Sequence, residues 1–308
     1  MRPNRQWGIP IDTFSTTAAA DRDGSTAPIP EAGTRRADTT MSLTSPTFLL
    51  CPPDHFGVEY VINPFMDLHE PVDLDLAHQQ WRRLRATLEL FGAQVKEQPA
   101  VKGLPDIVFT NNAALVCGSR ALLSRFRHVE RQGETEHNAK ALRALGLEVH
   151  ELHPDGGSFE GAADAIPVGE YLVCAYGPRT SRAAVPYLAE FAGLKPFAVE
   201  LVDPRLYHLD MTFCQLNERS AIIAEMAFNK ADLARLFELV PDPILITDEE
   251  ALSFCGNAVV VGTNVLMHKA SERLSAELAQ RGFEVTEVPV GEFTKAGGSL
   301  RCLSLRLA

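Results

Sequence analysis

Apolar residues recur at helical spacing in five stretches of the chain. In residues 76–91 the apolar side chains Ala77, Trp81 and Leu84 fall on one stripe, which Gly92 ends. The other four predicted helices are a stretch that ends at Leu145-Gly146, residues 183–192, a stretch capped by Asn229, and a stretch that opens at Ser271. The pattern therefore predicts one helix about every 45 to 50 residues.

Short extended segments follow the helices, as in residues 146–151 and 282–287. Each is followed by a turn and then by an apolar strand pair, predicted over residues 108–116, 165–175 and 258–267. At the end of the chain, Gly297 and Gly298 permit a tight turn. Leu303, Leu305 and Leu307 then alternate as in a strand, so we expect Cys302 to point to the opposite face.

Small polar residues mark the starts of the predicted strand pairs at intervals of 45 to 52 residues. These markers are Asn63, Asn112, Asp164, Asp210, Asn257 and Cys302. One helix lies in each interval, and a steady period of this kind is typical of a repeat architecture. We therefore predict an α/β fold of five similar units closed into a ring, with the polar markers facing its axis. The alternative is an ordinary α/β sandwich in which the spacing is accidental.

The composition limits the partners and the compartment. The chain has 308 residues and a net charge of -11, which disfavours nucleic acid and anionic membranes as partners. No apolar run reaches the roughly 18 residues that cross a bilayer. The six cysteines are spread without metal-site spacing, which indicates a reduced, cytoplasmic protein. A homo-oligomer stays open.

The first 41 residues differ from the rest of the chain. They are rich in Ala, Thr, Pro, Asp and Arg and show no hydrophobic period, so we predict a disordered extension. Met41 is an alternative start, because ordered patterning begins just after it. The remainder, residues 42–308, is predicted to be a single catalytic domain.

The candidate chemistry is that of a cysteine with a distant histidine and carboxylates. Phosphate, dinucleotide, zinc-protease and G-x-S-x-G motifs are absent from the sequence. His208 and Asp210 stand two residues apart at a predicted strand start and so share one side, where the acid raises the imidazole pKa. The functional interpretation is general acid–base catalysis, and the alternative is a structural pair.

Further polar residues occupy similar corners. Glu160 and Asp164 lie among small residues, and buried acids need a partner such as a cationic substrate. Asp106 and Asn112 bound another corner, where a plain turn is the alternative. Arg179 follows an apolar strand and is either a surface residue or a carboxylate clamp. For Asn63 and Asn257, capping or strand-end roles are the simpler interpretation.

Taken together, these segments resemble the guanidino-group-modifying superfamily, the penteins, over roughly residues 47–308. The resemblance rests on ordered landmarks: residues 51–56, 105–112, 131–134, Phe159-Glu160-Gly161, His208-Leu209-Asp210, and Gly297-Gly298 followed by Cys302. It implies a five-bladed α/β propeller that needs no metal or organic cofactor. It also implies a small guanidino substrate, such as arginine or an analogue.

The resemblance assigns roles to individual residues. It implies that Cys302 is the nucleophile, that His208 is the general acid and base, and that Glu160 and Asp210 hold the guanidinium. Arg179 resembles the arginine that grips the substrate α-carboxylate. The predicted substrate-binding set is completed by Asn112, Asp106, Asn63 and Asp164.

One position separates the members of the superfamily. Deiminases and dimethylarginine hydrolases carry an acid where this chain has Asn112, whereas the arginine dihydrolases resemble it in carrying asparagine. We therefore expect an arginine dihydrolase-like enzyme that yields ornithine, carbon dioxide and ammonia. The alternatives are a dimethylarginine dimethylaminohydrolase or deiminase that yields citrulline, an amidinotransferase, an inactive arginine-binding protein, and a cysteine amidase of unrelated fold.

Overall fold

The computed structural model describes residues 45–307, and the predicted disordered extension, residues 1–41, lies outside this range. Five longer helices occupy the five predicted stretches. They are α1 (Leu74–Leu90), α3 (Glu134–Ala144), α4 (Val185–Ala192), α5 (Lys230–Leu239) and α7 (Glu272–Gln280). The predicted cap is confirmed, because the side chain of Asn229 accepts hydrogen bonds from the first turn of α5. Ser271, where the fifth helix was predicted to open, caps α7 in the same way.

Three short helices have no counterpart in the sequence pattern. They are α2 (Val129–Gln132), α6 (Asp248–Leu252) and α8 (Gly291–Thr294). Each has four or five residues, too few for an apolar stripe to show a helical period. The helix α6 still has a capping box, formed by Thr247 and Glu250.

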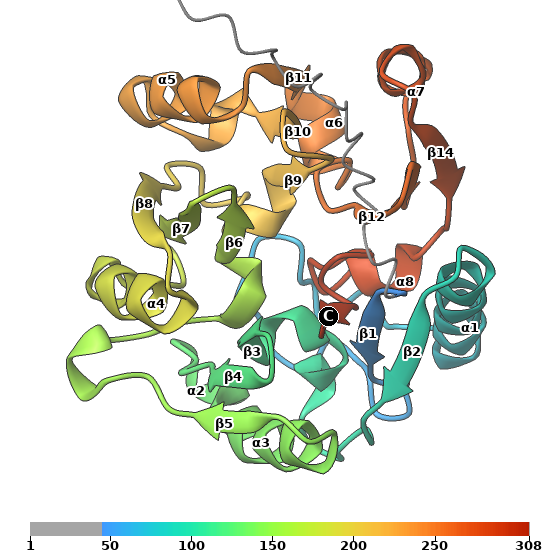
Figure 1. Ribbon diagram of the computed structural model, residues 1–308. Coiled ribbons are helices and arrows are strands. Elements are labelled where there is room, and N and C mark those ends of the chain that lie inside the picture. Colours follow the sequence, from blue (N-terminus) through green and yellow to red (C-terminus); the bar gives the residue numbers. More distant parts are fainter. Residues whose placement is uncertain (1–44, 308) are drawn as a thin grey trace, which may run out of the picture. The chain divides into compact units, whose positions relative to one another are not determined.

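The described strands form five sheets of three strands each, which fit a pseudo-fivefold arrangement (Figure 1). The strands of the second and third sheets are β3 (Ala114–Cys117), β4 (Arg120–Leu123), β5 (Glu148–His150), β6 (Ala165–Val168), β7 (Tyr171–Tyr176) and β8 (Lys195–Glu200). Those of the fourth and fifth are β9 (Phe213–Gln215), β10 (Ser220–Ala224), β11 (Asp242–Ile246), β12 (Val259–Val261), β13 (Asn264–Met267) and β14 (Glu284–Glu287). Each of these sheets is an antiparallel hairpin to which a third strand adds in parallel. A helix connects the second and third strands, as a parallel pairing requires.

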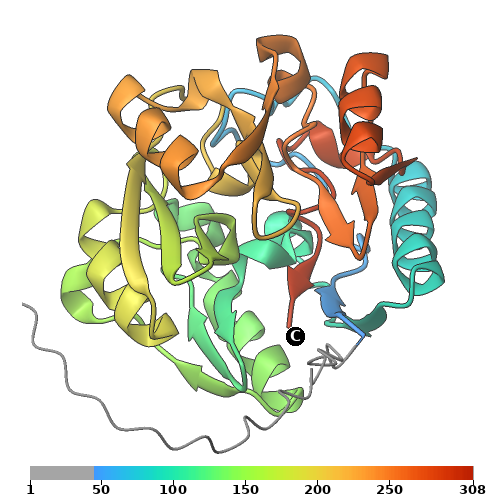
Figure 2. The same cartoon turned by 45° about the horizontal axis from the view of Figure 1, so that its top comes forward.

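The first sheet joins the two ends of the described chain. Its strands are β1 (Thr47–Leu50), β2 (Gln94–Glu97) and β15 (Leu305–Arg306). Strand β15 pairs antiparallel with β1, which pairs in parallel with β2 across α1. This sheet therefore has the same pattern as the others, but its hairpin partner comes from the C-terminal end. The pairing brings the C-terminal strand, which follows the turn that carries Cys302, beside the start of the described chain (Figures 1 and 2).

The predicted strand boundaries are wrong in several places around the polar markers. Residues predicted as strand between Val108 and Asn112 form 3-10 turns, Pro105–Val108 and Thr110–Asn112, because Pro105 starts a tight turn and the hydroxyl of Thr110 holds the carbonyls of Leu49 and Leu303. Asn63 precedes no strand, and His208 opens the 3-10 turn Leu209–Met211.

Cys302 also departs from its predicted position. It lies in a turn before β15, and only Leu305–Arg306 form a strand. Consequently Cys302 and Leu303 are both buried, at 4% and 0% exposure, and do not alternate between two faces.

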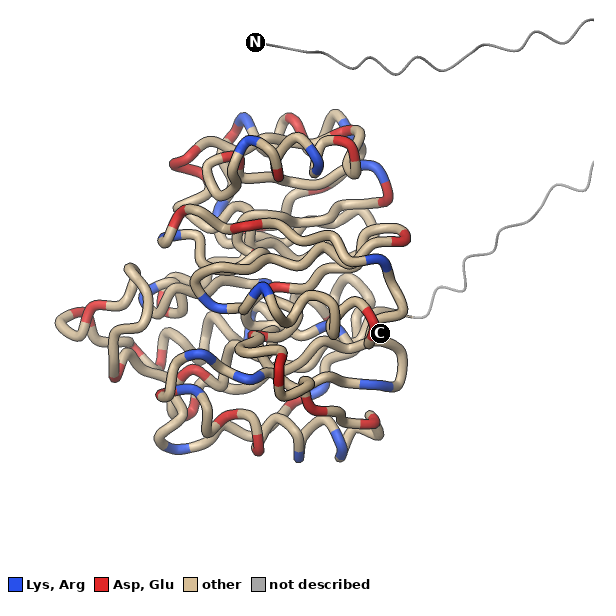
Figure 3. Tube along the Cα trace, turned by 90° about the vertical axis from the view of Figure 1, so that its left-hand side faces the viewer, with Lys and Arg blue, Asp and Glu red and all other residues tan. Residues whose placement is uncertain are grey.

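The outer helices carry charges of both signs. Figure 3 shows lysine and arginine interspersed with aspartate and glutamate along them. Among the described residues, no helix has the length and apolarity needed to span a bilayer. All six cysteines are unpaired.

Candidate active site

Cys302 lies at a small buried cavity close to where the sheets meet. The cavity has a volume of about 10 Å³, enough for roughly one water molecule. Six of the predicted site residues line it: Asn63, Asp106, Asn112, Arg179, His208 and Cys302. The other three, Glu160, Asp164 and Asp210, are buried and contact side chains of this lining. Residues from six different segments of the chain thus converge on one place.

The two glycines before Cys302 are required by close contacts. Gly297 has φ +84°, and a side chain there would meet the hydroxyl of Tyr207 at 2.5 Å. A Cβ on Gly298 would lie 2.2 Å from the ring of Phe109. The turn can therefore lie against the cavity only without side chains at these positions.

His208 lies between two carboxylates. Its Nε2 is 3.2 Å from Oε2 of Glu160, and its Nδ1 is 3.1 Å from Oδ2 of Asp164. The second contact is an ion pair without hydrogen-bond alignment. Burial opposes charge on the ring, but the carboxylates of Asp164 and Glu160 outweigh it and raise the pKa of His208 to about 9. The imidazole is therefore a cation at neutral pH.

Glu160 is compensated from a second side by Arg179. The guanidinium Nη1 lies 3.0 Å from Oε2 of Glu160, and Nη2 donates to the carbonyl of Ile62 at 3.0 Å. The same guanidinium lies over the ring of Tyr207, 4.6 Å from its centroid. Burial favours the neutral acid, yet Arg179 and His208 hold the pKa of Glu160 well below its ordinary value. Arg179 is buried, so the surface alternative for this residue is wrong.

Asp210 is the carboxylate nearest to the thiol. Its Oδ2 accepts a hydrogen bond from Nδ2 of Asn111 at 2.7 Å and lies 3.7 Å from Sγ of Cys302. Within residues 45–307 it forms no ion pair, and burial raises its pKa to about 6 although His208 and Arg301 favour its charge. The thiol is affected in turn, because burial and then Asp210 raise the pKa of Cys302 well above its usual value. Among the described residues, this half of the site therefore lacks a cation in an ion pair with its acid.

Asn257 contacts the nucleophile candidate at two atoms. Its Nδ2 donates to Sγ of Cys302 at 3.2 Å, and its Oδ1 accepts from the backbone N–H of Cys302 at 3.2 Å. The same Nδ2 lies 3.0 Å from the carbonyl of Asp210. The strand-end interpretation of Asn257 therefore omits its main contact. The signal was present in the sequence, because Asn257 is one of the repeat markers.

Arg131 was absent from the predicted site, but it lines the cavity and forms a buried cluster with Asn112. Its guanidinium contacts both oxygens of Glu134, at 2.7 and 2.9 Å, and donates to Oδ1 of Asn112 at 3.2 Å. Since the guanidinium can only donate, it fixes the amide with Nδ2 toward His208, whose Nε2 is 3.5 Å away. The usable signal was present in the sequence, because residues 131–134 are one of the landmarks of the resemblance and place Arg131 and Glu134 three residues apart.

Three predicted substrate contacts have different surroundings. Asp164 accepts from Thr180 Oγ1 at 2.6 Å and from the N–H of Leu209 at 3.0 Å, and lies behind His208. The amide of Asn63 bridges the carbonyl of Ala296 and the N–H of Phe65. Asp106 lines the cavity with Oδ1 unpartnered among the described residues, and burial raises its pKa.

Comparison with known proteins identifies the family. The family described as N,N dimethylarginine dimethylhydrolase, eukaryotic, matches residues 62–307. The chain belongs to the dimethylarginine dimethylhydrolase family.

Relatives of this dimethylarginine dimethylhydrolase family member are named for different activities. The bifunctional arginine dihydrolase/ornithine cyclodeaminase AgrE of Nostoc sp. is 41% identical over 267 residues, covering 84% of the chain but 37% of AgrE. The chain thus spans little more than a third of that relative. The N(G),N(G)-dimethylarginine dimethylaminohydrolase of Mycobacterium tuberculosis is 36% identical over 261 residues, covering 84% of the chain and 85% of the relative.

A solved structure of similar fold contains a bound substrate. It is the N-terminal domain of ArgZ, described as an arginine dihydrolase from the ornithine–ammonia cycle in cyanobacteria, with a cysteine replaced by serine. The TM-score is 0.82 at 37% identity, covering 86% of the chain and 98% of that domain. In this dimethylarginine dimethylhydrolase family member, residues 45–307 contain no group of three or more His, Cys, Asp or Glu arranged to hold a metal ion.

Proposed function

We propose that the protein hydrolyses the guanidino group of arginine through a covalent intermediate on Cys302, as an arginine dihydrolase. The observation that carries the proposal is the carboxylate of Asp210, which is buried 3.7 Å from Sγ without an ion pair among the described residues. A buried carboxylate without a cation is costly, so a guanidinium bound between Asp210 and Glu160 would be favoured. Cys302 would then face the guanidino carbon.

The positive charge of the substrate would favour ionisation of the Cys302 thiol. Burial and Asp210 keep the thiol of Cys302 protonated in the free protein. A guanidinium beside Asp210 offsets that negative charge and lowers the thiol pKa, while Nδ2 of Asn257 donates to the sulfur. The thiolate attacks the guanidino carbon, and the C–N bond to the leaving nitrogen breaks.

His208 supplies and recovers the proton. As an imidazolium it gives its Nε2 proton to the departing nitrogen, so ammonia leaves and a thiouronium remains on Sγ. The neutral ring then takes a proton from water, which attacks the same carbon and frees the thiol. Asp164 and Glu160 hold the ring in place through both proton transfers.

A second cycle on the ureido product distinguishes a dihydrolase from a deiminase. The ureido group is neutral, and Asn112 offers it an uncharged amide where an acid would favour only a cation. Two waters and arginine then give ornithine, carbon dioxide and two molecules of ammonia. The likeness to AgrE and to substrate-bound ArgZ supports this outcome. Because one relative is named as a dimethylarginine dimethylaminohydrolase, the second candidate function is a single hydrolysis that releases dimethylamine.

We also infer that the five sheets are the blades of a five-bladed α/β propeller and that residues 42–308 form one catalytic domain. The repeated hairpin-plus-parallel-strand pattern and the pairing of β1 with β15 support this interpretation. A cytoplasmic location is inferred from the cysteine pattern of the sequence.

A product screen by mass spectrometry tests the function. Purified protein is incubated with arginine, methylated arginines, citrulline and agmatine, with and without glycine as an amidino acceptor. We expect ornithine with two ammonia equivalents from arginine, and none from the Cys302→Ser variant. Citrulline with one ammonia would mean a deiminase, citrulline with dimethylamine a dimethylarginine hydrolase, and a modified glycine a transferase.

A further inference from the structure

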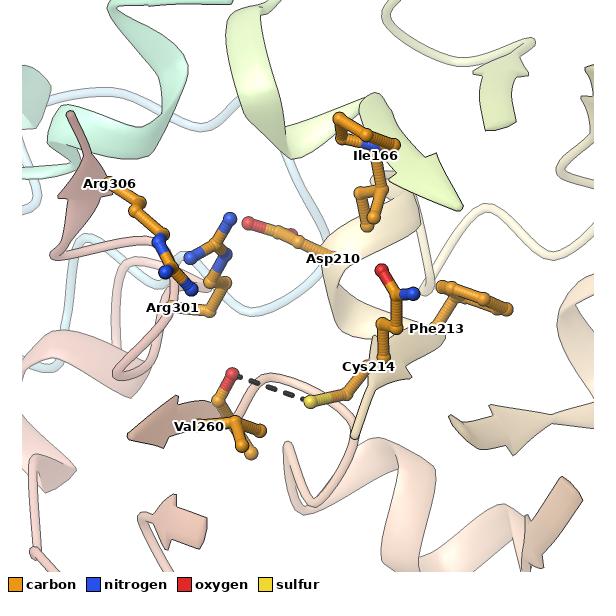
Figure 4. A pocket seen from close by; sticks show the side chains of 10 residues that line it. Ile166, Asp210, Phe213, Cys214, Val260, Arg301 and Arg306 are labelled. Atoms are coloured by element: carbon orange, nitrogen blue, oxygen red, sulfur yellow. Dashed lines mark hydrogen bonds between the residues drawn. The ribbon is translucent and has the colours of Figure 1, made fainter. Parts of the chain in front are cut away.

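A second cavity is lined by Asp210, the carboxylate nearest to the thiol of Cys302. It has a volume of about 310 Å³, within the range of small-molecule sites. Its walls come from β6, β9, β12 and the C-terminal segment, and Asp210, Cys214, Gln215, Val260, Arg301 and Arg306 are among its lining residues (Figure 4). Asp210 lines this cavity, while Cys302, which it contacts, lines the active-site cavity.

Two guanidinium groups face this second cavity. Figure 4 shows the ends of the Arg301 and Arg306 side chains beside each other, with the carboxylate of Asp210 toward Arg301. The side chain of Arg301 makes no ion pair with any residue between 45 and 307, and its charge helps to lower the pKa of Arg306. Two neighbouring cations at the wall of a cavity favour an oxyanion, because guanidinium forks match carboxylate and phosphate geometry.

We propose that this cavity is an anion site in which Arg301 and Arg306 bind the carboxylate or phosphate group of a small ligand. Neither the reaction nor the substrate contacts described above uses these two arginines. The remaining walls are largely apolar and include Ile166, Phe213 and Val260. The ligand is therefore a small molecule with one anionic group and a short apolar or neutral body.

Occupancy of this site is coupled to the active site through Asp210. Arg301 and Cys302 are consecutive residues that line different cavities. The groups that act on the Asp210 carboxylate are His208, Asn111, Arg301 and Asp164, of which only Arg301 lines the second cavity. An anion on Arg301 offsets its positive charge, which makes Asp210 easier to protonate. Cation binding beside Cys302 is then weakened, most strongly near pH 6.

Direct binding tests the site without any need for turnover. The full chain is titrated with inorganic phosphate, and separately with acetate, against sodium chloride at equal ionic strength, and the thermal unfolding midpoint is followed. We expect a saturable rise that is weakened about tenfold in an Arg301→Gln, Arg306→Gln double variant. The exposed side chain of Arg306 makes the single Arg306→Gln variant a safe second measurement, with a loss of about threefold.

The matched control is Arg82→Gln, which removes one exposed charge on α1 and is expected to leave binding unchanged. Preference for phosphate or acetate identifies the anionic group. Binding that the double variant retains, binding that disappears in the Cys302→Ser variant, or the lack of any saturable effect overturns the proposal.

A kinetic test of the coupling between the anion site and the active site rests on the proposed function. If the protein turns over arginine, phosphate should raise KM about two- to threefold near pH 6 and leave it unchanged near pH 8.5, where Asp210 stays ionised. The Arg306→Gln variant should need about threefold more phosphate for the same effect. An equal KM increase at both pH values overturns the coupling, whereas a protein without turnover that still binds phosphate refutes only the proposed function.

Discussion

The two halves of the candidate active site differ in how their charges are balanced. Around His208, two carboxylates and the guanidinium of Arg179 form ion pairs of 3.0 to 3.2 Å. Around Cys302, Asp210 has a neutral amide and a thiol within reach but no ion-paired cation among the described residues. Both halves are buried to a similar degree, so burial alone does not cause the difference.

This comparison shows how one cluster of buried acids can serve two purposes. Where cations surround Glu160, its pKa is held low, and the acid in turn keeps His208 charged. Where no cation is paired, the pKa of Asp210 rises to about 6 and the thiol stays protonated. The first half is prepared in advance for proton transfer. The second half becomes complete only when a cationic substrate arrives.

The largest expected effect is loss of the nucleophile. Replacing Cys302 by serine should lower turnover roughly 10⁴- to 10⁶-fold, because no thiolate can form. The buried turn should tolerate the smaller oxygen, so the circular dichroism spectrum should match that of the wild type. Product formation by the variant within tenfold of the wild-type rate would remove Cys302 from the reaction.

The charge-balanced half makes stability depend on alkaline pH. The pKa of His208 is raised from 6.5 to about 9, so its imidazolium stabilises the fold fully below pH 6.5. That contribution, about 3 kcal/mol, is lost as the pH rises through about 9. Urea unfolding at pH 6.5 and 9.5 should show the loss in the wild type and a smaller one in His208→Gln. Exchange of exposed His69 for glutamine serves as the control, and equal losses in all three proteins would contradict the ion-pair assignment.

Replacing Asp210, the acid without an ion-paired cation among the described residues, should change the rates at which two reagents alkylate Cys302 in opposite directions. In Asp210→Asn, kcat/KM should fall about 100-fold, since the guanidinium loses a buried counter-charge worth about 3 kcal/mol. The thiol pKa should fall as well, because the acid that raises it is gone. Neutral iodoacetamide should therefore alkylate Cys302 faster at pH 8, while cationic 2-chloroacetamidine should react more slowly. If both reagents change in the same direction, Asp210 does not act through its charge.

The smallest expected effect concerns the amide that holds the sulfur. In Asn257→Ala the thiolate loses one charge-assisted hydrogen bond, so alkylation by iodoacetamide at pH 8 should slow about tenfold. KM should change little, because Asn257 does not line the active-site cavity. Asn264→Ala, on β13 and away from the site, is the matched control. An alkylation rate equal to that of the control would leave Asn257 a purely structural residue.

Part of the site was predictable from the sequence and part was not. The repeat spacing indicated that Asn112, Asp164, Asp210 and Cys302 meet, and in the structure the first three stand at 3-10 turns that precede β3, β6 and β9. The strand-based explanation for His208 and Asp210 was wrong, because a 3-10 turn and not a strand separates them. The acids that raise the pKa of His208 are Asp164 and Glu160, from another sheet.

The sequence by itself determined the number of repeats, the main helices with their caps, and the identity of the polar markers. Those features depend on local periodicity and on capping side chains within a few residues of each other. Only the tertiary structure decided which acid meets which base, that Asn257 holds the sulfur, and that Asp210 lacks an ion-paired cation among the described residues. Such pairings depend on distances between side chains 44 to 99 residues apart, and on burial that no single segment produces alone.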